Sequence, residues 1–141
     1  MDLSLGEEIL IVLREYGPLT AEEIANYLRR DIREVNEELQ YLELDRFVTK
    51  VKKGVFRRRE AYELTPTGLE EALKAYEKLR AKSQELINKI NSLSPEELEE
   101  LMNQFSSIIP LLLLLNLIPL ELLMLLGLDM LLIGPMVIHD H

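Results

Sequence analysis

The most distinctive chemistry in this chain lies between Arg46 and Arg59, where seven side chains are basic and none is acidic. The whole chain has 141 residues and a formal net charge of −9, so this stretch reverses the sign of its surroundings. Closely spaced cations repel one another in a folded protein. A nucleic acid offsets that cost, because Lys and Arg neutralise phosphates and release condensed counterions. The alternatives are a solvated loop and a patch that binds the chain's own carboxylates.

A β-hairpin is predicted to carry these cations. Residues 47–51 mix aromatic and β-branched side chains, Lys53-Gly54 marks a break, and residues 61–64 resume an extended pattern. The loop between the two strands places a run of three arginines where they can project. The side chains that we predict to contact phosphates are Lys50, Lys52, Lys53, Arg57, Arg58 and Arg59.

Three short helices are predicted before the hairpin. Apolar residues recur at helical spacing from Leu5 to Tyr16, and Gly17-Pro18 ends this helix, with glycine suited to a left-handed cap. Thr20 and Glu23 have the spacing of a capping box, which opens the second helix. A second such box at residues 31–34 opens the third helix, whose buried residues are predicted to be Val35, Leu39 and Leu42. Short helices joined by a tight turn are typical of a helix-turn-helix.

Three pieces of sequence carry a resemblance to a known group of proteins. They are residues 19–28 (LTAEEIANYL), residues 39–43 (LQYLE) leading to Phe47-Val48, and residues 62–69 (YELTPTGL). In this order the chain resembles the winged-helix transcriptional regulators, the broad group that contains the MarR, PadR and ArsR families. The resemblance covers about residues 5–92. It implies a mainly α fold with a small β-hairpin wing, and DNA binding as a dimer with the third helix in the major groove.

The third helix, the recognition helix of that resemblance, has an acidic character. Glu34, Glu37, Glu38 and Glu43 outnumber Arg33, and Glu37 lies in the middle of the face opposite the buried one. The hairpin is therefore expected to supply most of the attraction for DNA. After this helix the chain has Asp45-Arg46 where the group usually has Gly, which implies a different turn. The residues that we predict to lie near bases are Arg33, Asn36, Gln40 and Tyr41.

A long helix is predicted after Thr65, its N-cap, and Pro66, its first residue. Apolar residues alternate at spacings of four and three along it, with Ser83 the only polar member. We interpret this seam as a coiled-coil-like dimer contact, formed by Ala72, Tyr76, Leu79, Leu86, Ile90 and Leu93. The alternative is that the C-terminal segment folds back over the seam within one chain.

The C-terminal segment is acidic and Leu-rich. Ser94, Pro95 and Glu97 predict a helix start. Residues 108–133 are almost wholly apolar, which exceeds the roughly 18 to 20 residues of a membrane span. Charged and helix-breaking residues interrupt this run, and no Lys, Arg, Trp or Tyr flanks either end. We favour short helices in an oligomer core over a membrane segment or an apolar ligand site; the interrupting residues include Pro110, Pro119, Glu121 and Asp129.

Enzyme, metal and cofactor sites find little support in the sequence. Cysteine is absent, and both histidines lie at the chain end, where His139-Asp140-His141 is interpreted as a terminal segment and not as a metal site. No Gly-rich phosphate loop or Ser-His-Asp set is present. We therefore predict a protein that is not an enzyme and that has no cofactor or metal. The first residues lack the basic region of a signal peptide. The absence of cysteine fits a reducing cytosol, so we predict a cytoplasmic location, with a membrane-associated one as the alternative.

Two functions from different classes remain. The first is a dimeric, or higher-order, DNA-binding transcriptional regulator that contacts double-stranded DNA through a winged helix. The alternative is a winged-helix module for protein contact, tethered to a membrane through the Leu-rich segment. The predicted regions are a winged helix-turn-helix at residues 1–66, a dimerisation helix at 67–93 and a helical C-terminal segment at 94–141.

Overall fold

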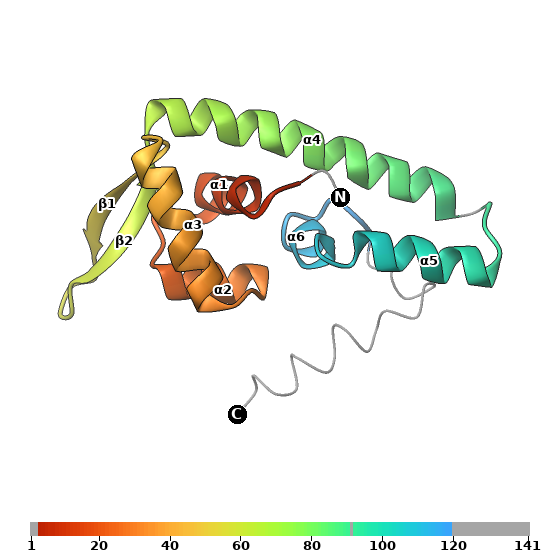
Figure 1. Ribbon diagram of the computed structural model, residues 1–141, viewed down its shortest axis with the longest axis horizontal. Helices are drawn as coiled ribbons and strands as arrows, with labels where there is room; N and C mark the ends of the chain where they lie inside the picture. The colour runs from red at the N-terminus through yellow and green to blue at the C-terminus, as the bar shows by residue number, and fades with distance from the viewer. Residues whose placement is uncertain (1–2, 91, 120–141) are drawn as a thin grey trace. The chain divides into compact units, whose positions relative to one another are not determined.

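The computed structural model describes residues 3–90 and 92–119. The chain divides into two compact units, residues 1–81 and 82–141, and the division falls within one long helix. The region limits predicted at residues 66 and 93 stay predictions. In chain order (Figure 1) the elements are α1 (Leu5–Tyr16), α2 (Ala21–Leu28), α3 (Ile32–Leu44), β1 (Val48–Lys53), β2 (Arg59–Leu64), α4 (Pro66–Ile90), α5 (Pro95–Phe105) and α6 (Ile109–Leu114).

The second and third helices begin near the predicted N-caps and bury the predicted apolar faces. The Thr20 hydroxyl accepts from the backbone N–H of Glu23 at 3.1 Å, and the Glu23 carboxylate accepts from the N–H of Thr20 at 2.9 Å. This confirms the predicted capping box of α2. At the start of α3, Asp31 is the N-cap and accepts from the N–H of Arg33 at 2.7 Å. The predicted capping box at residues 31–34 was wrong, because Asp31 caps the N–H of Arg33 and not that of Glu34. The predicted buried face of α3 is also confirmed, since Val35, Leu39 and Leu42 are buried.

The turn after α3 takes a left-handed residue without using glycine. Arg46 has φ of +63°. Its N–H donates to the carbonyl of Glu43 at 3.0 Å, and the N–H of Phe47 donates to the carbonyl of Leu42 at 2.9 Å. These two bonds are those of a Schellman motif, which satisfies the last carbonyls of a helix. Arg46 therefore takes the left-handed position that Gly usually has, and the different turn that the sequence implied does not form.

The prediction for Gly17 was wrong in its conformation. Gly17 ends α1 with φ of −67° and ψ of 164°, which is extended backbone and not a left-handed cap. A Cβ atom at Gly17 would lie 2.5 Å from the carbonyl oxygen of Leu13. Glycine is required here because the backbone passes close to the preceding helical turn.

The two strands form an antiparallel hairpin whose register pairs Val48 with Leu64 and Lys53 with Arg59. Figure 1 shows this hairpin beside α3, with its tip projecting beyond the helices. An isolated bridge anchors it, because the N–H of Tyr62 donates to the carbonyl of Leu19 at 2.8 Å and the reverse bond measures 3.1 Å. The hairpin is thereby fixed to the segment that leads into α2.

The base of the hairpin is closed by the start of α4. The Thr65 hydroxyl accepts from the N–H of Gly68 at 2.9 Å, which confirms Thr65 as the N-cap. The same hydroxyl donates to the carbonyl of Arg46 at 2.7 Å. A Cβ atom at Gly68 would lie 1.9 Å from the carbonyl oxygen of Phe47, so only glycine permits this approach.

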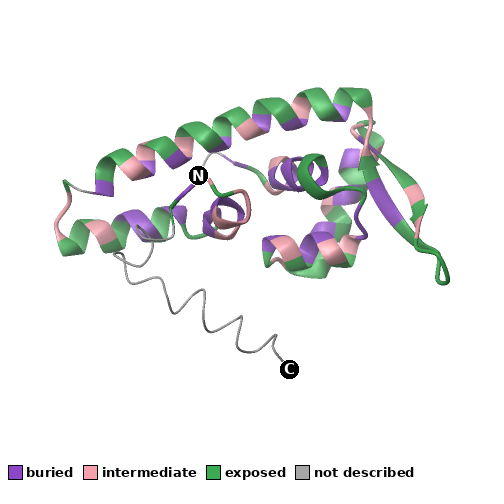
Figure 2. Ribbon diagram, turned by 180° about the vertical axis from the view of Figure 1, so that it is seen from behind, coloured by how far each residue is buried: buried purple, intermediate pink, exposed green. Residues whose placement is uncertain are grey.

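The predicted seam on α4 is buried within the single chain. Ala72, Leu79 and Leu86 are fully buried and Ile90 is 6% exposed, whereas Tyr76 and Leu93 are half-buried. Figure 2 shows the buried positions recurring along this helix. The alternative explanation for the seam was that the C-terminal segment folds back over it within one chain. Burial leaves these four side chains little surface for a second chain. A dimer contact at these positions stays a prediction, but Leu69 and Leu73 on α4 are more exposed, at 44% and 42%.

The second unit contains the predicted helix start at Ser94, which forms a full capping box with Glu97 and has Pro95 in the first turn. Leu101, Met102 and Phe105 form the buried face of α5. Only the first part of the apolar run lies in the described residues, and it forms the six-residue helix α6. No helix in residues 3–90 or 92–119 has the length and hydropathy to cross a membrane. Glu121, Asp129 and the terminal His139-Asp140-His141 lie outside the described residues.

Candidate nucleic-acid interface

Four of the predicted phosphate-contacting side chains are exposed and unpaired. Lys52, Arg57, Arg58 and Arg59 are exposed, and none forms an ion pair with any residue that the structure describes. Lys52 lies on β1, Arg57 and Arg58 lie in the turn, and Arg59 begins β2. Cations without a carboxylate partner lose no internal ion pair when they meet a phosphate. The alternative in which the three arginines fold against the chain's own carboxylates is therefore not what the structure shows.

Two other predicted side chains are engaged with the protein itself. The Lys50 ammonium lies 3.7 Å from the Glu43 carboxylate and 3.9 Å from that of Glu60. The Lys53 ammonium lies 3.0 Å from the Glu23 carboxylate and donates to the carbonyl of Pro18 at 3.0 Å. Lys50 and Lys53 thus link the hairpin to α3 and to the start of α2.

The predicted base-contacting residues lie on the exposed side of α3. Asn36 and Gln40 are exposed, and Tyr41 is 56% exposed. Arg33 is exposed as well, but its guanidinium lies 3.2 Å from the Asp31 carboxylate. Hydrogen bonds from Arg33 lower the pKa of Asp31. Contact between Arg33 and a base therefore requires that this surface ion pair open, which costs little because water and salt screen exposed pairs.

Two of the four acidic side chains on α3 lie partly within the fold. Glu43 pairs with Lys50, and the Glu38 carboxylate is half-buried beside Gly6 of α1. Glu34 and Glu37 remain exposed. The acidic character of the outer face of α3 is therefore smaller than the count of carboxylates in the sequence indicates.

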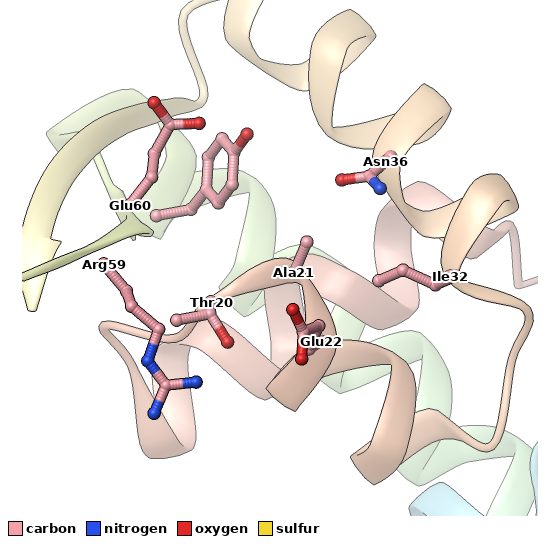
Figure 3. A pocket seen from close by; sticks show the side chains of 8 residues that line it. Thr20, Ala21, Glu22, Ile32, Asn36, Arg59 and Glu60 are labelled. Carbon is pink, nitrogen blue, oxygen red and sulfur yellow. The ribbon is translucent and has the colours of Figure 1, made fainter. Parts of the chain in front are cut away.

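A groove of about 310 Å³ lies between α3 and the hairpin. Asn36 and Ile32 from α3 line one side, and Arg59 and Glu60 from β2 line the other (Figure 3). The start of α2 lines it between them, through residues 20–22. The structure thus brings a residue of the predicted base-contacting set and a residue of the phosphate-contacting set to one concavity.

The groove also contains groups that the sequence did not single out. Tyr62 lines it, and burial raises the pKa of this phenol, with the Glu60 carboxylate adding to the effect. Tyr62 thus keeps its proton and can donate a hydrogen bond. Glu22 contributes a carboxylate, as does Glu60, which pairs with Lys50. No cluster of three or more His, Cys, Asp or Glu suited to a metal occurs among the described residues.

A buried ion pair fixes α1 to the turn between α2 and α3. Glu8 is 1% exposed, and its carboxylate accepts from the Arg30 guanidinium at 3.0 and 3.3 Å. Burial raises the pKa of Glu8 to about 7, although the nearby Arg30 acts in the opposite direction. Sequence reasoning missed this pair, because residues far apart in the chain form it; the only available signal was a Glu directly beside the apolar face of α1.

Comparison with solved structures identifies the fold. No family model and no curated protein matches the chain. The adhesin competence repressor AdcR from Streptococcus pyogenes is similar over 76% of this chain and 79% of its own, with a TM-score of 0.57 and 20% identity. A mutant of MepR from S. aureus is similar over 76% of this chain and 78% of its own, with a TM-score of 0.51 and 23% identity.

The chain has the winged helix-turn-helix fold. The predicted resemblance to winged-helix regulators of the MarR group is confirmed at the level of the fold, as is the mainly α class with a small hairpin. In winged-helix terms, α3 is the recognition helix and the β1–β2 hairpin is the wing. The groove described above lies between these two elements.

Proposed function

We propose that this winged helix is a double-stranded DNA-binding transcriptional regulator. The observation that supports this most is the groove shared by Asn36 on the recognition helix and Arg59 on the wing. In a duplex, the phosphate backbone separates the major groove from the minor groove. A protein that places a helix in one and a hairpin at the other needs a concavity between them for that backbone. This groove has that position, and the exposed Arg59 lies at its edge.

The cations of the wing form two groups, four without an ion pair to a described residue and two with one. In the proposal, Lys52, Arg57, Arg58 and Arg59 contact phosphates directly. Lys50 and Lys53 hold the wing against α3 and α2 and contact phosphates only when their ion pairs open. Arg33, Asn36, Gln40 and Tyr41 lie near base edges, where Asn and Gln pair with adenine and Arg pairs with guanine.

A salt titration of duplex binding tests the proposal. Each phosphate contact contributes roughly 0.9 to the slope of log affinity against log salt concentration. We expect the triple variant Arg57→Glu, Arg58→Glu, Arg59→Glu to lose most duplex affinity and to reduce the slope by about 3. The matched control is Lys74→Glu, Arg80→Glu, Lys89→Glu, which changes the net charge equally at exposed positions on α4. Equal affinity in the two triple variants, measured by fluorescence anisotropy, would contradict the role of the wing.

Assembly as a homodimer belongs to the same proposal. AdcR is named a repressor, and its similarity to this chain is one of fold. A second copy of this chain would place two recognition helices on one duplex and double the number of phosphate contacts. The exposed Leu69 and Leu73 on α4 are apolar positions suited to such a contact. Light scattering with and without duplex measures the mass of the complex.

A protein-contact module remains a second candidate, because Leu44 at the end of α3 is 77% exposed and the exposed Tyr41 lies one helical turn before it. Such a pair suits an apolar contact with another protein. The two functions differ in one variant: Leu44→Ser should leave DNA affinity unchanged and abolish a protein contact at this end of α3. A chain with no duplex affinity at low salt would favour the second candidate.

A further inference from the structure

The tip of the wing presents two large apolar side chains to solvent. Val55 is 86% exposed and Phe56 is 101% exposed. Figure 2 shows the whole tip as exposed surface. Gly54 has φ of +112°, and a Cβ atom there would lie 2.3 Å from the carbonyl oxygen of Arg57. The turn is therefore tight, and its backbone geometry depends on glycine.

Cations flank these apolar side chains in the sequence. Arg57, Arg58 and Arg59 follow Phe56 directly, and Lys52 lies just before the turn; all four are exposed and lack an ion pair with the residues that the structure describes. A partner for this tip must satisfy both chemistries. It needs anionic groups at the rim and an apolar space, wide enough for one or two side chains, between them.

The minor groove of duplex DNA provides this combination. It is about 6 Å wide, so it excludes a helix, but single side chains at a hairpin tip can reach into it. Phosphates line both rims, and the faces of stacked bases are apolar. Proteins that enter this groove use apolar side chains, Phe among them, to open a base step and bend the duplex toward the major groove.

We propose that Phe56, supported by Val55, is a wedge that enters the minor groove and partly unstacks one base step. This inference rests on the proposed function and extends it. Arg57, Arg58 and Arg59 would hold the phosphates at the rim while the ring enters between bases. The recognition helix would lie in the adjacent major groove of the DNA. The phosphate backbone between the two DNA grooves would lie in the protein groove that Asn36 and Arg59 line. The chain would therefore bend its site, and the flexibility of the base step at the wing would contribute to sequence preference.

An anionic lipid surface combines similar chemistries, since basic residues and Phe also occur on membrane-binding segments. Two observations favour DNA. Only two apolar side chains lie at this tip, which is little area for lipid binding. The tip also belongs to the hairpin that, together with α3, lines the groove suited to a duplex backbone.

The test uses the full chain and the duplex that it selects from a random-sequence pool. Donor and acceptor dyes at the duplex ends report bending, and 2-aminopurine placed in turn at each step near the wing reports unstacking. We expect the wild-type chain to bring the ends together and to raise 2-aminopurine fluorescence at one step. Phe56→Ala should abolish both signals and weaken binding about tenfold, while the salt slope stays unchanged. Phe56→Leu should retain the bend, and Leu44→Ala, an exposed apolar control, should change nothing.

The possible results distinguish a failure of the proposed wedge from a failure of the proposed function. A Phe56→Ala chain that bends and unstacks DNA as the wild type does would overturn the wedge and leave the regulator intact. A wild-type chain that binds duplex without a bend would do the same. A wild-type chain that selects no duplex would overturn both proposals. Sedimentation with vesicles of phosphatidylserine, lost in Phe56→Ala, would assign the tip to lipid and overturn the wedge.

Discussion

The Lys53 ammonium lies 3.0 Å from the Glu23 carboxylate, and this contact ties the end of β1 to the first turn of α2. Glu23 is also the reciprocal member of the Thr20 capping box, so one carboxylate serves both the helix start and the wing. The orientation of the wing relative to the helix-turn-helix is thus linked to the cap of α2.

Loss of the Lys53–Glu23 ion pair should make the wing less ordered. It should have a smaller effect on phosphate contacts. We expect Lys53→Met to lower the free energy of unfolding by less than about 1 kcal/mol, because the pair is partly exposed. Amide hydrogen exchange in β1 and β2 should become faster. The salt slope of duplex binding should change less than in Arg57→Met, which removes an unpaired cation. A larger drop of the slope in Lys53→Met than in Arg57→Met would mean that Lys53 contacts phosphate itself.

The buried Glu8 should make stability depend on pH. Its pKa in the folded chain is about 7, above the ordinary 4.5, so the folded state holds the proton more tightly than the unfolded state. The contribution of Glu8 therefore favours folding below pH 4.5 and is lost as the pH rises to about 7. The change amounts to roughly 3 kcal/mol at most. Urea denaturation at pH 5 and pH 8 measures it.

Glu8→Gln supplies the comparison. This variant keeps the size of the side chain and a hydrogen-bond acceptor for Arg30 while it removes the titration. We expect its free energy of unfolding to depend less on pH between 5 and 8 than that of the wild type. Glu96→Gln, at an exposed position on α5, is the matched control and should preserve the wild-type dependence. An equally steep dependence in Glu8→Gln would assign the pH effect to other groups.

Arg46 should be the site of a stabilising substitution. A left-handed conformation costs an L residue roughly 1 to 2 kcal/mol, and glycine avoids this cost while it loses about 0.5 to 1 kcal/mol of backbone entropy. Arg46→Gly is therefore expected to raise the free energy of unfolding by about 0.5 kcal/mol. Arg80→Gly, in the interior of α4, should lower it by about 1 kcal/mol. Lower stability in Arg46→Gly would indicate that the arginine side chain contributes more than its backbone costs.

Glu37 should weaken DNA binding through its charge. It is exposed on the face of α3 that carries Asn36 and Gln40, and it lies among the residues proposed to approach bases. We expect Glu37→Gln to raise duplex affinity several-fold at low salt, with a smaller gain at high salt because ions screen the charge. Glu99→Gln on α5 should leave the affinity unchanged. Weaker binding in Glu37→Gln would instead indicate that the Glu37 carboxylate accepts a hydrogen bond from the amino group of a cytosine.

Dimer formation should depend on the exposed side of α4. Leu69→Ser with Leu73→Ser should lower the mass measured by light scattering and leave the circular dichroism spectrum unchanged, because both side chains are exposed in the single chain. Leu79→Ser, at a fully buried position, should instead destabilise the fold. If the double variant retains the wild-type oligomer, the contact lies elsewhere.

Local signals allowed the helix starts and the wing to be predicted. Thr20, Thr65 and Ser94 are N-caps where the sequence placed them, because capping depends on residues within one turn. The buried face of α3 followed from its spacing in the same way. The three arginines of the wing tip are exposed, as expected for a projecting loop, although Glu60 follows Arg59 directly.

Features that depend on distant segments were not predictable. The spacing of Leu79 and Leu86 identifies an apolar seam, but whether the same chain or a second one covers it depends on tertiary packing. The partners of Lys50 and Lys53 come from α2, α3 and β2, so their involvement in ion pairs needed the fold. Gly17 was predicted as a left-handed cap because it is a glycine. The structure shows that glycine is needed there because the backbone passes close to the Leu13 carbonyl.

The bond from the Thr65 hydroxyl to the Arg46 carbonyl, with the N–H of Thr65 on the carbonyl of Phe47, closes the hairpin at its base. The chain leaves the helical core and returns to it at the same point. Turn residues beyond that closure can be exchanged for those of another length or composition without a change in how the core assembles. The turn is therefore the exchangeable part of the hairpin, and in the proposed DNA-binding function a foreign turn on this frame would change the preferred target.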